Sequence, residues 1–194
     1  MALEFSRGRA MIFVESNRIF TSENYGPMPI FALKAPVLAQ LQAALAPRGF
    51  RAAGTLFQRE LAEVVHLVEL QSTQEENAAH IAVTINLGVF APALVDPDIR
   101  DYIRPSIPQA HWRERIGILM PQRRDKWWSI ENAGQAAAVG AEIAVSVEEY
   151  GLAPLAKIPD IAALRRIWET GASPGLSDYQ RRRYLERLTA SSQD

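Results

Sequence analysis

The stretch from His80 to Phe90 (HIAVTINLGVF) constrains the fold more than any other part of this chain. Its apolar residues occupy every second position, which is the pattern of a β-strand with one buried face. Pro92 follows closely and cannot donate a hydrogen bond to a sheet, so the strand ends before it. We therefore expect a strand whose apolar side belongs to the core and whose other side carries Thr84 and Asn86.

Three further segments have the composition of strands. Residues 50–61 are interrupted at Gly54, and Val64–Gln71 follows after a short turn. His111–Met120 is expected to return as a fourth strand. These strands follow one another without intervening helices, which favours an antiparallel meander over parallel βαβ units.

Apolar residues at helical spacing predict helices before and after the strands. The first covers Pro36–Ala46, and a second begins at Ser129 and ends at Gly151. Two more are expected over Asp160–Thr170 and Asp178–Thr189. The predicted fold class is therefore α+β, with a four-stranded antiparallel meander sheet and helices packed on one of its faces.

The order of these elements predicts three parts. Residues 1–34 form an N-terminal extension, either a loose segment or a small hairpin with arms near 10–15 and 18–22. Residues 35–156 form the α+β core domain. Residues 157–194 form a C-terminal helical extension that packs on the core.

Composition excludes several classes of protein. The 194 residues include no cysteine, so disulfide frameworks and thiolate chemistry are excluded. The net charge of −1 and a pI near 6.3 argue against a nucleic-acid-binding protein. No apolar run is long enough for a membrane span, and the run Ala10–Val14 is too short for a signal peptide. We expect a cytoplasmic protein that does not contact membranes.

Motifs that would indicate catalysis or cofactor binding are missing from the sequence. The glycines form no phosphate-binding or dinucleotide-binding loop, and no serine lies in a G-x-S-x-G turn. His66, His80 and His111 lack the spacing of metal ligands. We therefore expect no catalytic residue, no metal and no cofactor.

Six short segments occur in a characteristic order along the chain, from the end of the first predicted helix to the end of the second. They are LAPRGF (45–50), GTLFQRE (54–60), INLGVF (85–90), RERIGIL (113–119), DKWW (125–128) and EYGL (149–152). With this set the chain resembles a bacterial domain-of-unknown-function family, number 4304, over residues 36–156. The turn at Ala62-Glu63 lacks the glycine of that pattern, and both ends of the chain lie outside it. The resemblance supports the fold class and implies no activity.

The polar side of the sheet offers the first candidate site. Arg113 and Arg115 are two residues apart on a strand, so both guanidinium groups project from one face. If this strand lies beside 80–90, then Thr84 and Asn86 are their neighbours. Arginine forks at such a place suit a carboxylate, a phosphate or an acidic protein surface. Alternatively, both arginines pair with Glu69, Glu114 or Glu60.

Trp127 and Trp128 form the second candidate. Adjacent side chains point apart, so we expect at most one of the two rings to be fully buried. The other ring then lines a groove, where an aromatic group with a polar atom is useful in recognition. Alternatively, both rings close the edge of the sheet, and Asp125 caps the local turn.

Two functions of different class fit these observations. The first is a non-catalytic binding module, similar in role to an immunity or adaptor protein, that recognises a protein partner through the polar sheet face. The second is a protein or enzyme that uses Arg113, Arg115 and Asn86 to hold a small anionic ligand. A flat or open polar face favours the protein partner, whereas a deep pocket with converging polar groups favours the ligand.

Overall fold

The computed structural model describes residues 13–15, 18–20, 30–73, 81–96, 98–99 and 103–190. Its centre is one antiparallel sheet, in which five strands follow chain order and a sixth pairs with the central strand. The strands are β3 (Arg51–Ala53), β4 (Leu56–Glu60), β5 (Val65–Ser72), β6 (Ile81–Phe90), β7 (Trp112–Arg115) and β8 (Trp128–Ile130). The α+β class is confirmed, but the expected number of four strands is wrong.

The extra strands arise where the sequence shows a single continuous pattern. Residues 50–61 form two strands, β3 and β4, because the chain reverses at Gly54, whose φ of 67° favours glycine. The predicted strand His111–Met120 is also wrong in its second half. Only Trp112–Arg115 is extended, and Ile116–Leu119 forms the short helix α2.

The chain then returns to the sheet as β8, so the predicted start of a helix at Ser129 is wrong, and α3 begins only at Ala133. β8 pairs with the first half of β6 at Ile81–Val83, whereas β7 pairs with the second half at Asn86–Val89. The return passes close to α2, since a Cβ at Gly117 would lie 2.6 Å from the backbone nitrogen of Lys126. Glycine at this position therefore lets the two segments pack.

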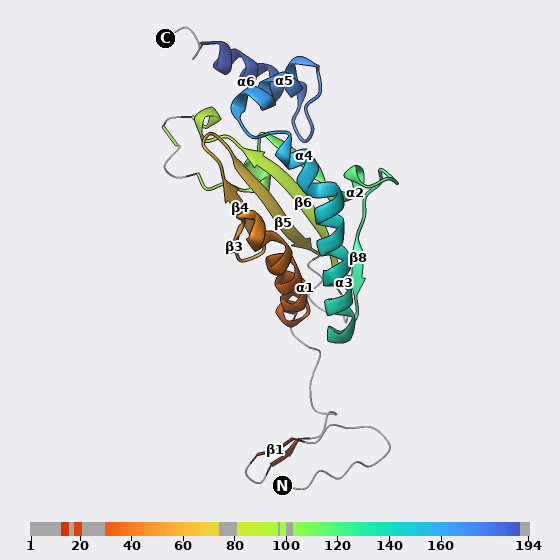
Figure 1. Ribbon diagram of the computed structural model, residues 1–194. Coiled ribbons are helices and arrows are strands. Elements are labelled where there is room, and N and C mark those ends of the chain that lie inside the picture. The colour runs from red at the N-terminus through yellow and green to blue at the C-terminus, as the bar shows by residue number, and fades with distance from the viewer. Residues whose placement is uncertain are drawn as a thin grey trace.

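Two long helices cover one face of the sheet (Figure 1). They are α1 (Ile30–Leu45) and α3 (Ala133–Ser146), and α3 continues through a π-helical segment, Val147–Gly151, into α4 (Leu152–Ala156). The predicted helix start at Pro36 is wrong, because α1 begins six residues earlier and contains this proline. Gly151 does not end a helix; its lack of a side chain lets it pack against Leu87 and Ile116.

The main core lies between these helices and the apolar side of the sheet. β6 contributes Ile81, Val83, Ile85, Leu87 and Val89, all at most 1% exposed. α1 and α3 cross closely at Gly140, where an added Cβ would lie 2.9 Å from the Cα of Val37. The small residues of α3 therefore allow the tight packing that ridges of larger side chains would prevent.

Two further helices, α5 (Ile161–Glu169) and α6 (Asp178–Ala190), lie at one end of the sheet (Figure 1). The buried ring of Trp168 joins α5 to the main core. A buried polar contact fixes the preceding chain: His66 Nε2 donates to the carbonyl of Ile158 at 2.7 Å, and its Nδ1 accepts from Arg59. Burial lowers the pKa of His66 and so favours the neutral ring, which can accept a hydrogen bond at Nδ1 and donate one from Nε2.

The second face of the sheet is half covered by the chain that follows β6. The short helices η3 (Pro92–Leu94) and η5 (Ile107–Gln109) belong to this segment. It forms a smaller apolar cluster on β5 and β6, made of Val65, Leu67, Phe90, Ile107 and Ala110. Gly88 permits the contact, because a Cβ there would lie 2.9 Å from the Cβ of Ala110. Only the remainder of this face is left for recognition.

In the N-terminal part, β1 (Phe13–Glu15) and β2 (Arg18–Phe20) pair antiparallel, with Val14 opposite Ile19. These strands correspond to the arms of the hairpin considered from the sequence. Much of the expected extension 1–34, including the turn at Ser16-Asn17, lies outside the described residues.

Replacing Gly140 with leucine should destabilise the fold by about 3 kcal/mol, because the backbones of α1 and α3 would have to separate. Ala141→Leu is the matched control, since it adds the same side chain to an exposed position of the same helix. We expect the control to change the free energy of unfolding by less than about 0.5 kcal/mol in urea denaturation. Equal effects of both variants would show that the crossing at Gly140 is not close.

Candidate binding site on the polar sheet face

Polar side chains form a row across three neighbouring strands on the second face. In the register of the sheet, Glu69 of β5 lies opposite Asn86 of β6, and Asn86 lies opposite Arg115 of β7. Arg113 lies opposite Gly88 and therefore on the same face. The structure thus brings together three of the residues that the sequence singled out: Asn86, Arg113 and Arg115.

Hydrogen bonds connect this row into what we call the polar network, made of Glu69, Gln71, Asn86, Arg115, Asp125 and Trp127. Asn86 Nδ2 donates to Gln71 Oε1 at 2.8 Å and, more weakly, to Glu69 Oε2 at 3.5 Å. Arg115 Nε lies 3.4 Å from Asn86 Oδ1, and its Nη1 donates to Asp125 Oδ2 at 2.6 Å. The side chains therefore hold one another in fixed orientations.

Trp127 closes the network at its edge. Its indole Nε1 donates to Asp125 Oδ2 at 2.9 Å, and the guanidinium of Arg115 lies 5.3 Å from the centre of its ring. The ring is partly exposed. A tryptophan fixed in this way presents a rigid apolar surface with little loss of conformational freedom on binding.

Trp128 is buried on the opposite, helix-covered side and does not reach the candidate site. It is 4% exposed, and its Nε1 donates to Glu142 Oε1 of α3 at 2.6 Å. The expectation that at most one of the two adjacent rings is fully buried agrees with this arrangement. Trp128 is the first residue of β8 and faces the helices, whereas Trp127 directly precedes the strand and points to the other side.

Thr84 shares the side of Asn86 but is fully buried, so it cannot contact a ligand directly. Its Oγ1 donates to the backbone carbonyl of Lys126 at 2.7 Å. Thr84 lies at the point of β6 where neither β7 nor β8 pairs with it. The hydroxyl therefore bridges a gap in the sheet and holds the chain that carries Asp125 and Trp127.

Arg113 is held by hydrogen bonds to the backbone of neighbouring segments and is only partly exposed. Its Nη1 donates to the carbonyl of Pro108 at 2.7 Å, and its backbone nitrogen donates to the carbonyl of Pro174 at 3.1 Å. Gly175 lies directly against its side chain. Arg113 thus fixes one wall of the site, whereas Arg115 belongs to the network itself.

These residues surround an open, shallow depression of about 490 Å³. Glu69, Gln71, Asn86, Ile107, Pro108, Arg113 and Arg115 line it. Two arginines face Glu69 in the depression and Asp125 beside it, so the charges nearly balance. None of the expected ion pairs with Glu69, Glu114 or Glu60 forms among the described residues; the partner of Arg115 is Asp125.

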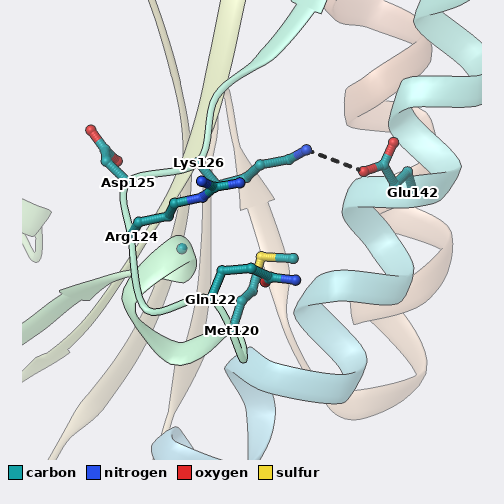
Figure 2. A pocket seen from close by; sticks show the side chains of 7 residues that line it. Met120, Gln122, Arg124, Asp125, Lys126 and Glu142 are labelled. Carbon is teal, nitrogen blue, oxygen red and sulfur yellow. Dashed lines mark ion pairs between the residues drawn. The ribbon is translucent and has the colours of Figure 1, made fainter.

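A second depression, of about 270 Å³, lies between residues 117–126 and α3 (Figure 2). Lys126 Nζ crosses it to within 3.6 Å of Glu142 Oε1, and Glu142 also accepts the hydrogen bond from Trp128. Figure 2 shows that Asp125 points away from this depression, whereas Arg124 extends along Lys126. Successive side chains of this segment therefore point to different sides of the sheet. Of these residues, only Asp125 and Trp127 belong to the polar network.

Sequence reasoning found part of this site. Asn86, Arg113 and Arg115 follow from the alternation of two strands, but Gln71 and Asp125 were not identified as members. The alternation of Val65, Leu67, Glu69 and Gln71 does place Gln71 on one side of β5. Only the register of β5 on β6 shows that it reaches Asn86.

His111 also lies on the second face but is covered by α6. It is 2% exposed, and its Nδ1 accepts from the backbone nitrogen of Ala91 at 3.0 Å. The rings of Phe90 and Tyr184 flank it, with centroids at 5.4 and 4.9 Å. Burial, together with the positive charge of Arg187, lowers the pKa of His111 to about 4.

Within the described ranges, no group of three or more histidine, aspartate or glutamate residues could hold a metal ion. His80, one of the three histidines weighed as a metal ligand, lies outside those ranges. In the same part of the chain, no helix is both long and apolar enough to cross a membrane.

Comparison with known proteins assigns the family. The model of the domain of unknown function DUF4304 matches residues 41–157, which is more than half of the chain. The chain therefore belongs to the DUF4304 family, as the resemblance over residues 36–156 predicted. The match includes every residue of the polar network. No curated protein and no solved structure matches the chain significantly.

The protonation of His111 should make the fold less stable in acid. The unfolded ring has a pKa near 6.5, so between about pH 6.5 and 4 the unfolded state binds more protons than the folded state. Stability contributed by the neutral ring is complete above this window and is lost as the pH falls, by about 2–3 kcal/mol at pH 4.

His111→Asn keeps an acceptor for the Ala91 N–H but cannot titrate in this window. We expect the free energy of unfolding of the variant to fall less than that of the unchanged protein between pH 7 and pH 4.5. Urea denaturation at both pH values measures the free energy of unfolding of each protein. The contributions of His66 and of the carboxylates are the same in both proteins and cancel when the two pH dependences are compared. Parallel pH dependences would show that His111 is not held neutral by the fold.

Proposed function

We propose that this chain is a non-catalytic binding module that recognises a partner protein through the polar network. One observation carries the proposal: side chains from three strands line an open depression and are held by one another and by Asp125 from the loop beside it. Preorganised polar groups lose little freedom on binding, which favours affinity and specificity. We also propose that the protein acts in the cytoplasm, in a role like that of an adaptor or immunity protein.

The chemistry of the network suits a protein surface with both donors and acceptors. Among the described residues, Gln71 Nε2 and Asp125 Oδ1 have no hydrogen-bond partner, so a donor and an acceptor remain available. Trp127 and Arg115 are of the residue types that contribute most to protein interfaces, and Pro108 adds an apolar wall. A partner segment with little net charge complements this face.

The alternative, a small anionic ligand held by Arg113, Arg115 and Asn86, fits less well. Arg115 already pairs with Asp125, and Arg113 already donates to a backbone carbonyl. A free anion would have to displace these partners and would face Glu69. The described residues that line the depression include no serine, histidine or lysine, so they offer no hydroxyl or amine nucleophile with an adjacent base.

The proposal can be tested by site-specific cross-linking in the cells that produce the protein. A benzophenone amino acid at position 127, in place of Trp127, should cross-link one defined protein, to be identified by mass spectrometry. Adding Arg115→Glu should reduce that product at least about tenfold, because the new carboxylate faces Asp125 and breaks the network.

Arg165→Glu is the matched control. Arg165 is also a surface arginine with one ion pair, to Glu169 at 2.7 Å, and reversing its charge changes the net charge equally. We expect the control to leave the cross-linked product unchanged. A product that survives Arg115→Glu, or that Arg165→Glu reduces to the same extent, would contradict recognition through the polar network.

A further inference from the structure

A third concave surface lies between α6 and the segment that follows β6, and the proposed recognition by the polar network does not depend on it. It is a groove of about 400 Å³, a volume within the range of small-molecule sites. One wall is apolar and consists of Phe90, Leu94, Val95, Ile99 and Ile103. The other wall belongs to α6 and consists of Tyr179, Gln180, Arg183, Tyr184 and Arg187.

His111 lines this groove and can offer it a hydrogen-bond donor. Its Nδ1 accepts a hydrogen bond from Ala91, so the neutral ring carries its proton on Nε2. No acceptor for Nε2 lies among the described residues, and Nε2 is not one of their buried side-chain atoms that lack a partner, so it remains open to the groove. A neutral imidazole N–H is a hydrogen-bond donor, so an oxygen atom that reached Nε2 from the groove could accept a hydrogen bond from it.

The α6 wall adds positive charge. Arg187 is fixed, since it donates to the carbonyl of Leu94 at 2.8 Å and lies 3.6 Å from Asp96. Arg183, one turn earlier on the same face, has no acidic group within ion-pair distance in the described part of the chain. Among the described residues that line the groove, the charged ones are Arg183, Arg187 and Asp96, which leaves one positive charge in excess.

Exposed apolar surface is concentrated at the same place. Of the three large hydrophobic residues that are most exposed in the described chain, Ile99 and Tyr179 both line the groove, at 49% and 68% exposure. Water next to such surface is displaced favourably by an apolar group. The groove therefore combines an apolar wall with donors for an anion, which is the complement of an amphipathic acid.

We propose that this groove binds a small apolar carboxylic acid, with its hydrocarbon part against Phe90, Leu94 and Ile99 and its carboxylate accepting hydrogen bonds from Arg183 and His111. A guanidinium group and a neutral imidazole N–H are both suitable donors to a carboxylate. The inference rests on α6 and not on the polar network, so either proposal can fail without the other.

Octanoate is the probe for this site, and isothermal titration calorimetry measures its binding to the full chain. Acetate, which has the head group alone, and octanol, which has the apolar part alone, should each bind at least about tenfold more weakly. Arg183→Ala should weaken octanoate binding about fivefold to tenfold, as expected for the loss of a charge-assisted hydrogen bond at an exposed site.

Arg182→Ala is the matched control, because Arg182 is exposed on the same helix but does not line the groove. It should leave the affinity for octanoate unchanged. In NMR spectra of the unchanged protein, octanoate should shift the His111 imidazole and the methyl groups of Ile99 and Ile103. This measurement does not depend on whether any variant folds.

Three results would overturn the proposal. One is the absence of octanoate binding up to its solubility limit. Another is equal affinity of the Arg183→Ala and Arg182→Ala variants. The third is a set of NMR shifts that spares His111 and falls on Asn86 or Trp127 of the polar network instead.

Discussion

The pairing of β6 with two successive strands along one edge is the constraint on which the rest of the structure depends. β7 pairs with the second half of this edge and β8 with the first half, while β5 pairs with the other edge from Val83 to Phe90. The backbone groups of a buried strand need hydrogen-bond partners. Because β8 pairs with β6 only up to Val83 and β7 only from Asn86, the edge has a gap beside Thr84. Thr84 closes the gap with a side-chain hydrogen bond to Lys126, and so fixes the path of the chain between β7 and β8.

That path explains why a recognition surface arises at this place. In the segment that returns to β8, Asp125 and Trp127 belong to the polar network, whereas Lys126 and Trp128 contact Glu142 of α3. Asp125 then meets Arg115 on β7, and Trp127 covers the same guanidinium. The ion pair is partly exposed and contributes little to stability on its own, so its main effect is to orient the side chains.

The sequence predicts the fold class and the central strand well. The strict alternation of apolar and polar residues in β6 determines which side of the strand faces the core. The sequence also brings Asn86, Arg113 and Arg115 together, since their side depends only on the period of a strand. It does not predict that Ile116–Leu119 is helical, because β-branched residues and a following proline favour a strand until the packing of Gly117 is known. The burial of Thr84, the partnership of Arg115 with Asp125 and the cover of His111 by α6 depend on contacts between distant segments, which no local pattern encodes.

The central claim is that the polar network is ordered before any partner binds. The Nε–H group of Arg115 reports on it directly, because its order parameter and its exchange with water can be measured by ¹⁵N NMR. We expect Arg115 to be nearly as rigid as the backbone of β7 and to exchange slowly. Arg166, which is exposed and takes no part in the network, provides the reference for a mobile side chain in the same sample. An Arg115 resonance as mobile and as rapidly exchanging as that of Arg166 would contradict the account.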